Sequence, residues 1–94
     1  MNYRVRATSR FRKDYKLLQR RGLDMSKLEH VVALLAAGTS LAEQYHDHHA
    51  LVGDFAGFRE CHVTPDWLLI YCIDNDLLIL TLSRTGTQSD LFGK

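Results

Sequence analysis

The second half of this 94-residue chain carries three strand-like segments in close succession, and they limit the folds open to it. The segments span residues 58–63, 67–73 and 77–84, and each is rich in apolar residues with high β propensity. Pro65 and the sequence Asp74-Asn75-Asp76 separate them, and both are typical of tight turns. Strands joined by such short turns pair in the antiparallel direction. The pattern therefore predicts an antiparallel meander.

The first half combines one strand pattern with two helix patterns. Apolar and polar residues alternate over residues 2–8, which predicts a strand with one buried face. Two stretches with apolar residues at helical spacing follow, and we expect Ser9 and Ser26 to cap them and Gly22 and Gly38 to end them. The short link between them predicts a helical hairpin.

These elements predict one α+β domain that spans residues 1–94. Its order is an N-terminal strand, a two-helix hairpin, and then a meander that completes a small, mostly antiparallel sheet. Both helices should cover one face of that sheet. The other face, which is expected to be polar and open, is where a ligand would bind.

The composition is that of an ordinary soluble globular domain, with 46% hydrophobic and 24% charged residues and one proline. No apolar run reaches the roughly 18 residues that cross a bilayer, and the N-terminus lacks the apolar region of a signal peptide. Cys61 and Cys72 lie in apolar strand-like segments, where free thiols are common. We therefore expect a cytoplasmic protein with no membrane partner.

Charge is distributed unevenly, although the net charge is only +1. The first 21 residues carry eight arginines and lysines and a single acid, Asp14, whereas the remainder carries four basic residues and ten acids. A polyanion would be attracted to the first part. A solvated helix face that merely happens to be basic explains the pattern equally well.

His62 and Asp66 flank the predicted turn at Pro65 and are candidates for acid–base chemistry. Imidazole titrates near neutral pH, and a nearby carboxylate can orient it and raise its pKa. The alternative is that Asp66 only caps the turn and that His62 is a half-buried strand residue. Spacing in the sequence does not decide between the two.

Three histidines, His46, His48 and His49, lie close together around Asp47. Two histidines at i and i+2 can chelate a metal only in an extended segment, and beyond His62 no well-spaced second pair of ligands accompanies them. We therefore expect a surface loop, or one histidine donated to a site, and no bound metal.

Arg84 ends the third strand-like segment and precedes Thr85-Gly86-Thr87. A guanidinium beside a turn that presents backbone N–H groups suits a phosphate or a phosphoryl transition state. An arginine at a strand end is as often a solvated cap. Trp67 and Phe92 are candidate platforms for an unpaired RNA base, although such rings more often anchor a core, and Arg59 is a further candidate for substrate contact.

Three segments, taken in order, resemble the YafQ-type toxins of the RelE superfamily. They are residues 49–53, GFRECHVTPDWLLIY at 57–71, and RTGTQSDLF at 84–92. The similarity covers nearly the whole chain, and the predicted order of a strand, two helices and three strands agrees with a RelE-like architecture.

The resemblance implies a ribosome-dependent endoribonuclease, an mRNA interferase. It would cut mRNA in the ribosomal A site by attack of a ribose 2′-hydroxyl on the adjacent phosphate, with no metal and no cofactor. The positions it assigns to the site are His49, His62, Asp66, Trp67, Arg84 and Phe92. In this assignment His49, His62 and Asp66 carry protons and Arg84 holds the phosphate; a one-residue shift would put His48 in place of His49.

The same resemblance implies three kinds of partner: a cognate antitoxin that neutralises the protein, the 70S ribosome with its ribosomal RNA, and mRNA. The basic segment is the surface we expect to dock on ribosomal RNA. The residues that we expect to make this contact are Arg10, Lys13, Lys16 and Arg20.

One position departs from the family pattern. The family usually has a histidine within the last segment, and Gln88 stands in its place here. Glutamine can hydrogen-bond a phosphate or a ribose, but it does not exchange protons near pH 7. We therefore expect a weakened or inactive enzyme. The alternative is a catalytically silent module of the same fold that binds the ribosome or the antitoxin.

Overall fold

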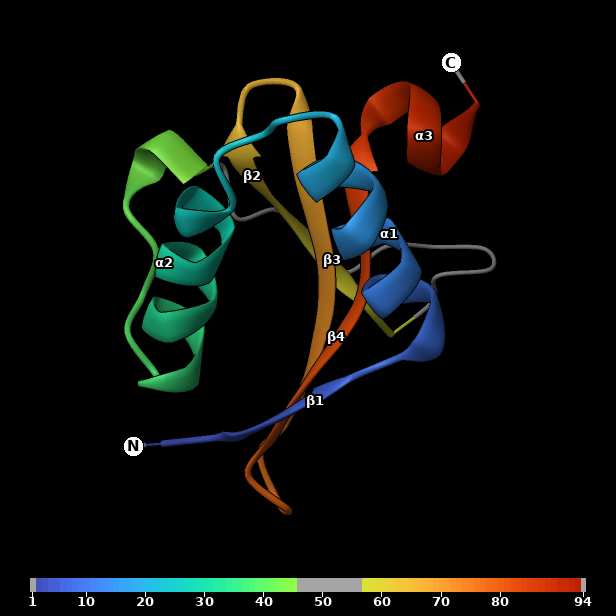
Figure 1. Cartoon of the computed structure of the whole chain (residues 1–94). Helices are drawn as coiled ribbons and strands as arrows, with labels where there is room; N and C mark the ends of the chain where they lie inside the picture. The colour runs from blue at the N-terminus through green and yellow to red at the C-terminus, as the bar shows by residue number, and fades with distance from the viewer. Residues whose placement is uncertain (1, 46–56, 94) are drawn as a thin grey trace.

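The computed structural model describes residues 2–45 and 57–93. Three helices, one 3₁₀ turn and four strands follow one another along this part of the chain (Figure 1). In order they are β1 (Arg4–Ala7), α1 (Ser9–Arg20), α2 (Met25–Ala36), η1 (Glu43–Tyr45), β2 (Arg59–Thr64), β3 (Trp67–Asp74), β4 (Ile79–Thr87) and α3 (Gln88–Phe92).

The four strands form one sheet in the order β1-β4-β3-β2. The β2–β3 and β3–β4 pairs are antiparallel, as the short turns predicted. β1 pairs in parallel with β4, so that the first strand lies beside the last. The α+β architecture and the antiparallel meander are thus confirmed, and the sheet as a whole is mixed.

The N-caps of the two long helices lie one and two residues before the predicted ones. Thr8, not Ser9, caps α1: its side-chain oxygen accepts the N–H of Phe11 at 3.0 Å. Asp24, not Ser26, caps α2 by accepting the N–H of Ser26 at 3.1 Å. An acceptor side chain in extended conformation just before the helix satisfies an N–H that has no partner within the helix.

α1 and α2 pack on the same face of the sheet, which we call the two-helix face (Figure 1). Its core consists of apolar side chains from both helices and from β2, β3 and β4. Among the fully buried members are Leu18, Leu28, Val31, Cys61, Leu69 and Leu80. Because alternate residues of a strand point to opposite faces, Leu69 and Tyr71 lie in this core and Leu68 and Ile70 lie on the other face.

A polar contact is built into this core. Trp67 is 3% exposed and Thr85 is 1% exposed. The Trp67 indole N–H donates to the Thr85 hydroxyl at 2.8 Å, and that hydroxyl donates to the Leu68 carbonyl at 2.8 Å. Each polar group of the pair therefore has a partner away from water.

Within the described residues, no helix has both the length and the apolar character to cross a membrane. Cys61 and Cys72 are both thiols that form no disulfide, as expected from their context.

Candidate functional site

The second face of the sheet carries its own small apolar cluster, and we call it the α3 face. Leu68 and Ile70 form the floor and are almost fully buried. Phe58, Leu91 and Phe92 pack against them. The five-residue helix α3, which the sequence did not predict, therefore covers part of a face that we expected to be open.

Strand register places two of the predicted site residues on the α3 face. His62 of β2 lies directly opposite Leu68 of β3, and Arg84 of β4 lies directly opposite Ile70. Residues that are paired across neighbouring strands point to the same face. The fold therefore brings His62, Arg84 and the α3 residue Phe92 around one apolar floor.

A β-bulge decides the direction of Arg84. Ile70 pairs with Arg84, but the next residue, Tyr71, pairs with Leu82, so Ser83 is an extra residue in β4. Without the bulge, strand alternation would put Arg84 on the same side as Leu82, inside the two-helix core. The bulge instead turns Arg84 to the α3 face.

Arg84 is paired with an acid that the sequence analysis did not select. Its Nε donates to Asp14 Oδ2 at 2.6 Å and its Nη2 donates to Asp14 Oδ1 at 3.0 Å. Both side chains are only 14% exposed. The hydrogen bond to Asp14 raises the pKa of Arg84, so the guanidinium stays charged. The expected phosphate-binding residue is thus neither solvated nor at the strand end, because β4 continues to Thr87.

His62 is held by the backbone of the turn that follows it. Its Nδ1 lies 3.1 Å from the carbonyl oxygen of Pro65. Since a carbonyl oxygen can only accept, Nδ1 carries the hydrogen, and in the neutral ring Nε2 is the nitrogen that can take up a proton. Asp66, the other predicted proton carrier, is exposed in the same turn.

Gln88 is the exposed first residue of α3, and the local backbone around it is well fixed. Thr87 and Asp90 form a capping box: Thr87 N–H donates to Asp90 Oδ2 at 3.0 Å, and Asp90 N–H donates to Thr87 Oγ1 at 3.1 Å. The side chain at position 88 therefore starts from a defined point at the end of β4, next to the α3 face.

The same aspartate ties α3 to α1. Arg21 Nη1 donates to Asp90 Oδ2 at 2.9 Å. The Arg21 hydrogen bond, together with the Thr87 N–H, lowers the pKa of Asp90 to about 2. Gly86 permits this close packing: at φ +157° it is in a region that L side chains rarely adopt, and an added Cβ would lie 3.0 Å from Asp90 Cβ.

Two residues predicted to touch substrate lie elsewhere. Trp67 is in the two-helix core with its indole N–H bonded to Thr85, so in this structure it offers no ring face for a base to stack on. Arg59 pairs with Tyr71 and therefore belongs to the two-helix face, opposite His62 and Arg84. Strand alternation places both away from the α3 face, whereas Phe92 does pack on that face.

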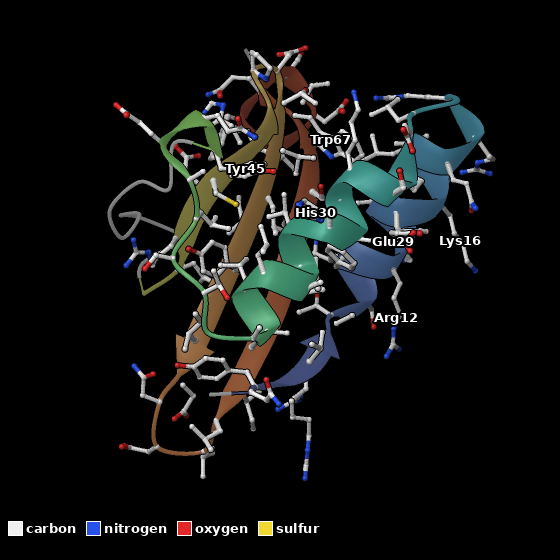
Figure 2. All side chains as sticks on the ribbon, turned by 90° about the vertical axis from the view of Figure 1, so that its left-hand side faces the viewer. Arg12, Lys16, Glu29, His30, Tyr45 and Trp67 are labelled. Atoms are coloured by element: carbon white, nitrogen blue, oxygen red, sulfur yellow. The ribbon has the colours of Figure 1, made fainter. Side chains whose placement is uncertain are left out.

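α1 presents its basic side chains to solvent. The residues expected to dock on ribosomal RNA, Arg10, Lys13, Lys16 and Arg20, are all exposed. Figure 2 shows Arg12 and Lys16 extending from α1 away from the body of the molecule. Arg12 was not selected from the sequence, although its spacing of four residues from Lys16 places both on one side of a helix.

The histidine segment lies outside the described residues, so the structure does not place His46, His48 or His49. In residues 2–45 and 57–93, no group of three histidine, cysteine, aspartate or glutamate side chains is arranged to hold a metal ion.

A hollow of about 530 Å³ lies on the two-helix side, between α2, η1 and the β2–β3 turn. His30 and Tyr45, which Figure 2 labels, are among its lining residues. None of the described site residues on the α3 face contributes to it. Lys27 and His30 line this hollow, so a cation and an imidazole occur together there as well. The α3 face remains the candidate site because His62 and Arg84, the pair selected for their chemistry, lie on it, and because a single RNA strand is bound along a surface rather than in an enclosed cavity.

The chain matches a family described as "Bacterial toxin of type II toxin-antitoxin system, YafQ" over residues 3–93. It is 39% identical over 89 residues to the mRNA interferase toxin YafQ of Escherichia coli K12, and the match covers 95% of each chain.

Two solved structures are similar over almost the whole fold. One is the E. coli DinJ–YafQ toxin–antitoxin complex, with 38% identity, a TM-score of 0.87, and coverage of 99% of this chain and 100% of the matched chain. The other is a metal-bound toxin from Helicobacter pylori, with 41% identity, a TM-score of 0.87, and coverage of 98% and 100%. At this identity the likeness extends beyond the general fold.

Proposed function

This chain belongs to the YafQ family of bacterial type II toxins, and we propose that it is an mRNA interferase, an endoribonuclease toxin that acts on ribosome-bound mRNA. The single observation that carries the proposal is the joint placement of His62 and Arg84 on the α3 face. A group that accepts protons and a permanent cation are what cleavage of a phosphodiester by its own 2′-hydroxyl requires.

In this reaction a base removes the 2′-hydroxyl proton, the 2′-oxygen forms a bond to phosphorus, and the bond from phosphorus to the 5′-oxygen breaks. The 5′-oxygen then takes up a proton, leaving a 2′,3′-cyclic phosphate and a 5′-hydroxyl. We assign proton transfer to His62 through Nε2, with Asp66 and His49 as the other proton carriers. Arg84 stabilises the charge that develops on the phosphorane. The scheme needs no metal or cofactor.

We further propose that the exposed basic side of α1 docks on ribosomal RNA and brings the α3 face to mRNA in the A site. Its cations are available for phosphate contacts, and such contacts supply affinity that does not depend on sequence. The toxin of the E. coli DinJ–YafQ complex binds an antitoxin, and we infer that a cognate antitoxin neutralises this chain as well.

Gln88 attenuates cleavage in this proposal. It stands beside the α3 face, where an imidazole could exchange protons and an amide cannot. The second candidate function follows from the same residue: if proton transfer at position 88 is indispensable, the protein is a silent module that binds the ribosome or the antitoxin without cutting.

Primer extension on programmed ribosomes tests both candidates with the present protein, Gln88→His and Arg84→Ala. Because a missing acid or base costs roughly 10² to 10⁴ in rate, we expect Gln88→His to cut at least about tenfold faster, with ribosome affinity nearly unchanged. Arg84→Ala should cut least. Toxin that has been treated with EDTA and then dialysed should cut as fast as untreated toxin, in the same magnesium-containing ribosome buffer, if the toxin uses no tightly bound metal.

The outcomes separate the candidates. Equal cleavage by the present protein and Gln88→His would show that position 88 transfers no proton. Absence of cleavage by both, with ribosome binding intact, would support the silent module. Loss of cleavage by the EDTA-treated and dialysed toxin, restored when a metal ion is added back, would contradict the metal-free scheme.

A further inference from the structure

Asp14 is the single acid of α1, whose sequence SRFRKDYKLLQR is otherwise neutral or basic. Arg10, Lys13 and Lys16 of the same helix are exposed, whereas the Asp14 side chain is only 14% exposed. Removing a carboxylate from water is unfavourable unless hydrogen bonds replace the water. The partners of Asp14 are therefore the reason for its position.

Those partners all belong to β4, just beyond the residues of β4 that pair with β1. β1 pairs with β4 only as far as Leu82, and α1 lies along the outer edge from there on. The Thr8 hydroxyl donates to the Ser83 carbonyl at 2.8 Å, and Asp14 Oδ2 accepts the N–H of Thr85 at 3.2 Å. α1 and its N-cap thus provide hydrogen-bond partners for the edge of β4 at the bulge residue and just after it.

The contact with Arg84 fixes one edge of the guanidinium. Asp14 accepts from Nε and from Nη2, in the geometry of a two-point arginine–carboxylate pair. Nη1 takes no part in this pair, so its N–H groups define the other edge. The planar fork is rigid, and holding one edge therefore sets the direction of the other.

We propose that Asp14 is a positioning residue, which holds Arg84 so that its Nη1 edge meets the phosphate on the α3 face. The inference rests on the proposed role of Arg84 and deepens it. Asp14 touches no substrate and exchanges no proton. Asp14 holds the Arg84 guanidinium in one orientation before the reaction begins. Without Asp14, this long and flexible side chain would have to adopt that orientation during the reaction.

Two effects of Asp14 oppose each other. Its negative charge weakens the attraction of Arg84 for the singly charged phosphodiester, and weakens it further for the phosphorane, which carries one more negative charge. Its hold on the guanidinium keeps the donors in place before the reaction, and we expect this effect to be the larger one, because stabilisation of the phosphorane depends on donors that need no reorientation. Asp14 should therefore favour the transition state even though it does little for substrate binding.

A nucleoside 2′,3′-cyclic vanadate, which mimics the five-coordinate phosphorane, is the probe, with affinity measured by calorimetry on the whole protein. Since an oriented charge-assisted donor is lost, Asp14→Asn should weaken vanadate binding by roughly tenfold or more. Arg84→Ala should weaken it at least as much. In the Arg84→Ala background, Asp14→Asn should have almost no further effect, because the carboxylate acts through that arginine.

Glu29→Gln is the matched control. Its carboxylate accepts a hydrogen bond from Tyr15 of α1 at 2.9 Å, whereas the carboxylate that pairs with Arg84 is that of Asp14, so the same chemical change at Glu29 should leave vanadate affinity unchanged. Should Asp14→Asn fail to fold, Asp14→Ser retains a short acceptor for the Thr85 N–H and still removes the two-point partner of Arg84.

Each outcome decides the inference. Unchanged or tighter vanadate binding by Asp14→Asn would overturn it and show that the carboxylate competes with phosphate. Equal binding by the present protein and Arg84→Ala would also overturn it, because Arg84 would then not be a phosphate ligand. If ribosome-dependent cleavage is absent while the vanadate results hold, the proposed enzyme function fails and the positioning role of Asp14 stands.

Discussion

The substitution Thr85→Val should destabilise the fold far more than its small change in shape suggests. Valine has nearly the volume of threonine, but it removes the hydroxyl that links Trp67 to the Leu68 carbonyl. Both hydrogen bonds are 2.8 Å long, and Thr85 and Trp67 are 1% and 3% exposed, so water cannot replace the lost partner.

A buried polar group left without a partner costs about 1 to 3 kcal/mol. The indole N–H and the carbonyl oxygen are both affected, and we therefore expect a loss of about 2 to 4 kcal/mol in the free energy of unfolding. For a domain of this size, 1 kcal/mol corresponds to about 4 to 8 °C, so Tm should fall by roughly 8 to 32 °C. Thermal unfolding followed by circular dichroism measures this directly.

Thr81→Val is the control on the same strand. Thr81 is only partly buried, and within the described residues its hydroxyl has no hydrogen bond, so its replacement should change stability by no more than about 0.5 kcal/mol. In a Trp67→Phe background the indole N–H is absent, and Thr85→Val should then cost about 1 to 2 kcal/mol less. Equal effects of the two valine substitutions, or full additivity with Trp67→Phe, would refute this account of the core.

Two further predictions concern charge. Because the folded protein lowers the pKa of Asp90 from 3.8 to about 2, its bond to Arg21 should stabilise the fold above pH 4 and lose that effect, about 1 kcal/mol, as pH falls toward 2. Urea midpoints measured across this range should show the loss, and Asp90→Asn should abolish this part of the pH dependence. Reversing the charges of Arg10, Lys13 and Arg20 should weaken ribosome binding and flatten its dependence on salt. Binding that is unchanged at several salt concentrations would contradict the docking role of α1.

Much of the fold follows from local patterns in the sequence. Turn residues and apolar segments of high β propensity define β2, β3 and β4. β2 alternates as a strand with one buried face does, whereas β3 is a continuous apolar run because both of its faces are covered. The two long helices are equally readable from apolar spacing. Their caps were each misplaced by one or two residues, because several neighbouring polar side chains can accept the first free N–H groups and only the backbone path selects one.

The candidate site was readable only in part. His62 and Arg84 were selected from their chemistry, and Phe92 from its place in the final segment. Trp67 and Arg59 were also selected, although register turns both toward the two-helix face. Strand alternation could have separated Arg59 from His62, since the two are an odd number of residues apart.

The partner of Asp14 illustrates what no local pattern shows. The sequence presents Asp14 as a lone acid in a basic helix, three residues after Phe11 and four before Leu18, so helical spacing places it on the buried side of α1. Its partner Arg84 is 70 residues away. Only the packing of α1 along the edge of β4 brings the two together, because periodicity shows which side a residue faces and not which distant residue it meets.

The sequence by itself determined the order of elements, the antiparallel meander, the basic character of α1 and the residue types available for phosphate chemistry. The tertiary structure decided which of those residues share a face. The physical reason is the bulge at Ser83: one extra residue reverses the alternation of β4, so that Thr85 enters the core and Arg84 turns to the α3 face. Thr8 and Asp14, which lie far away in the sequence, bind the backbone of β4 at the bulge residue and just after it.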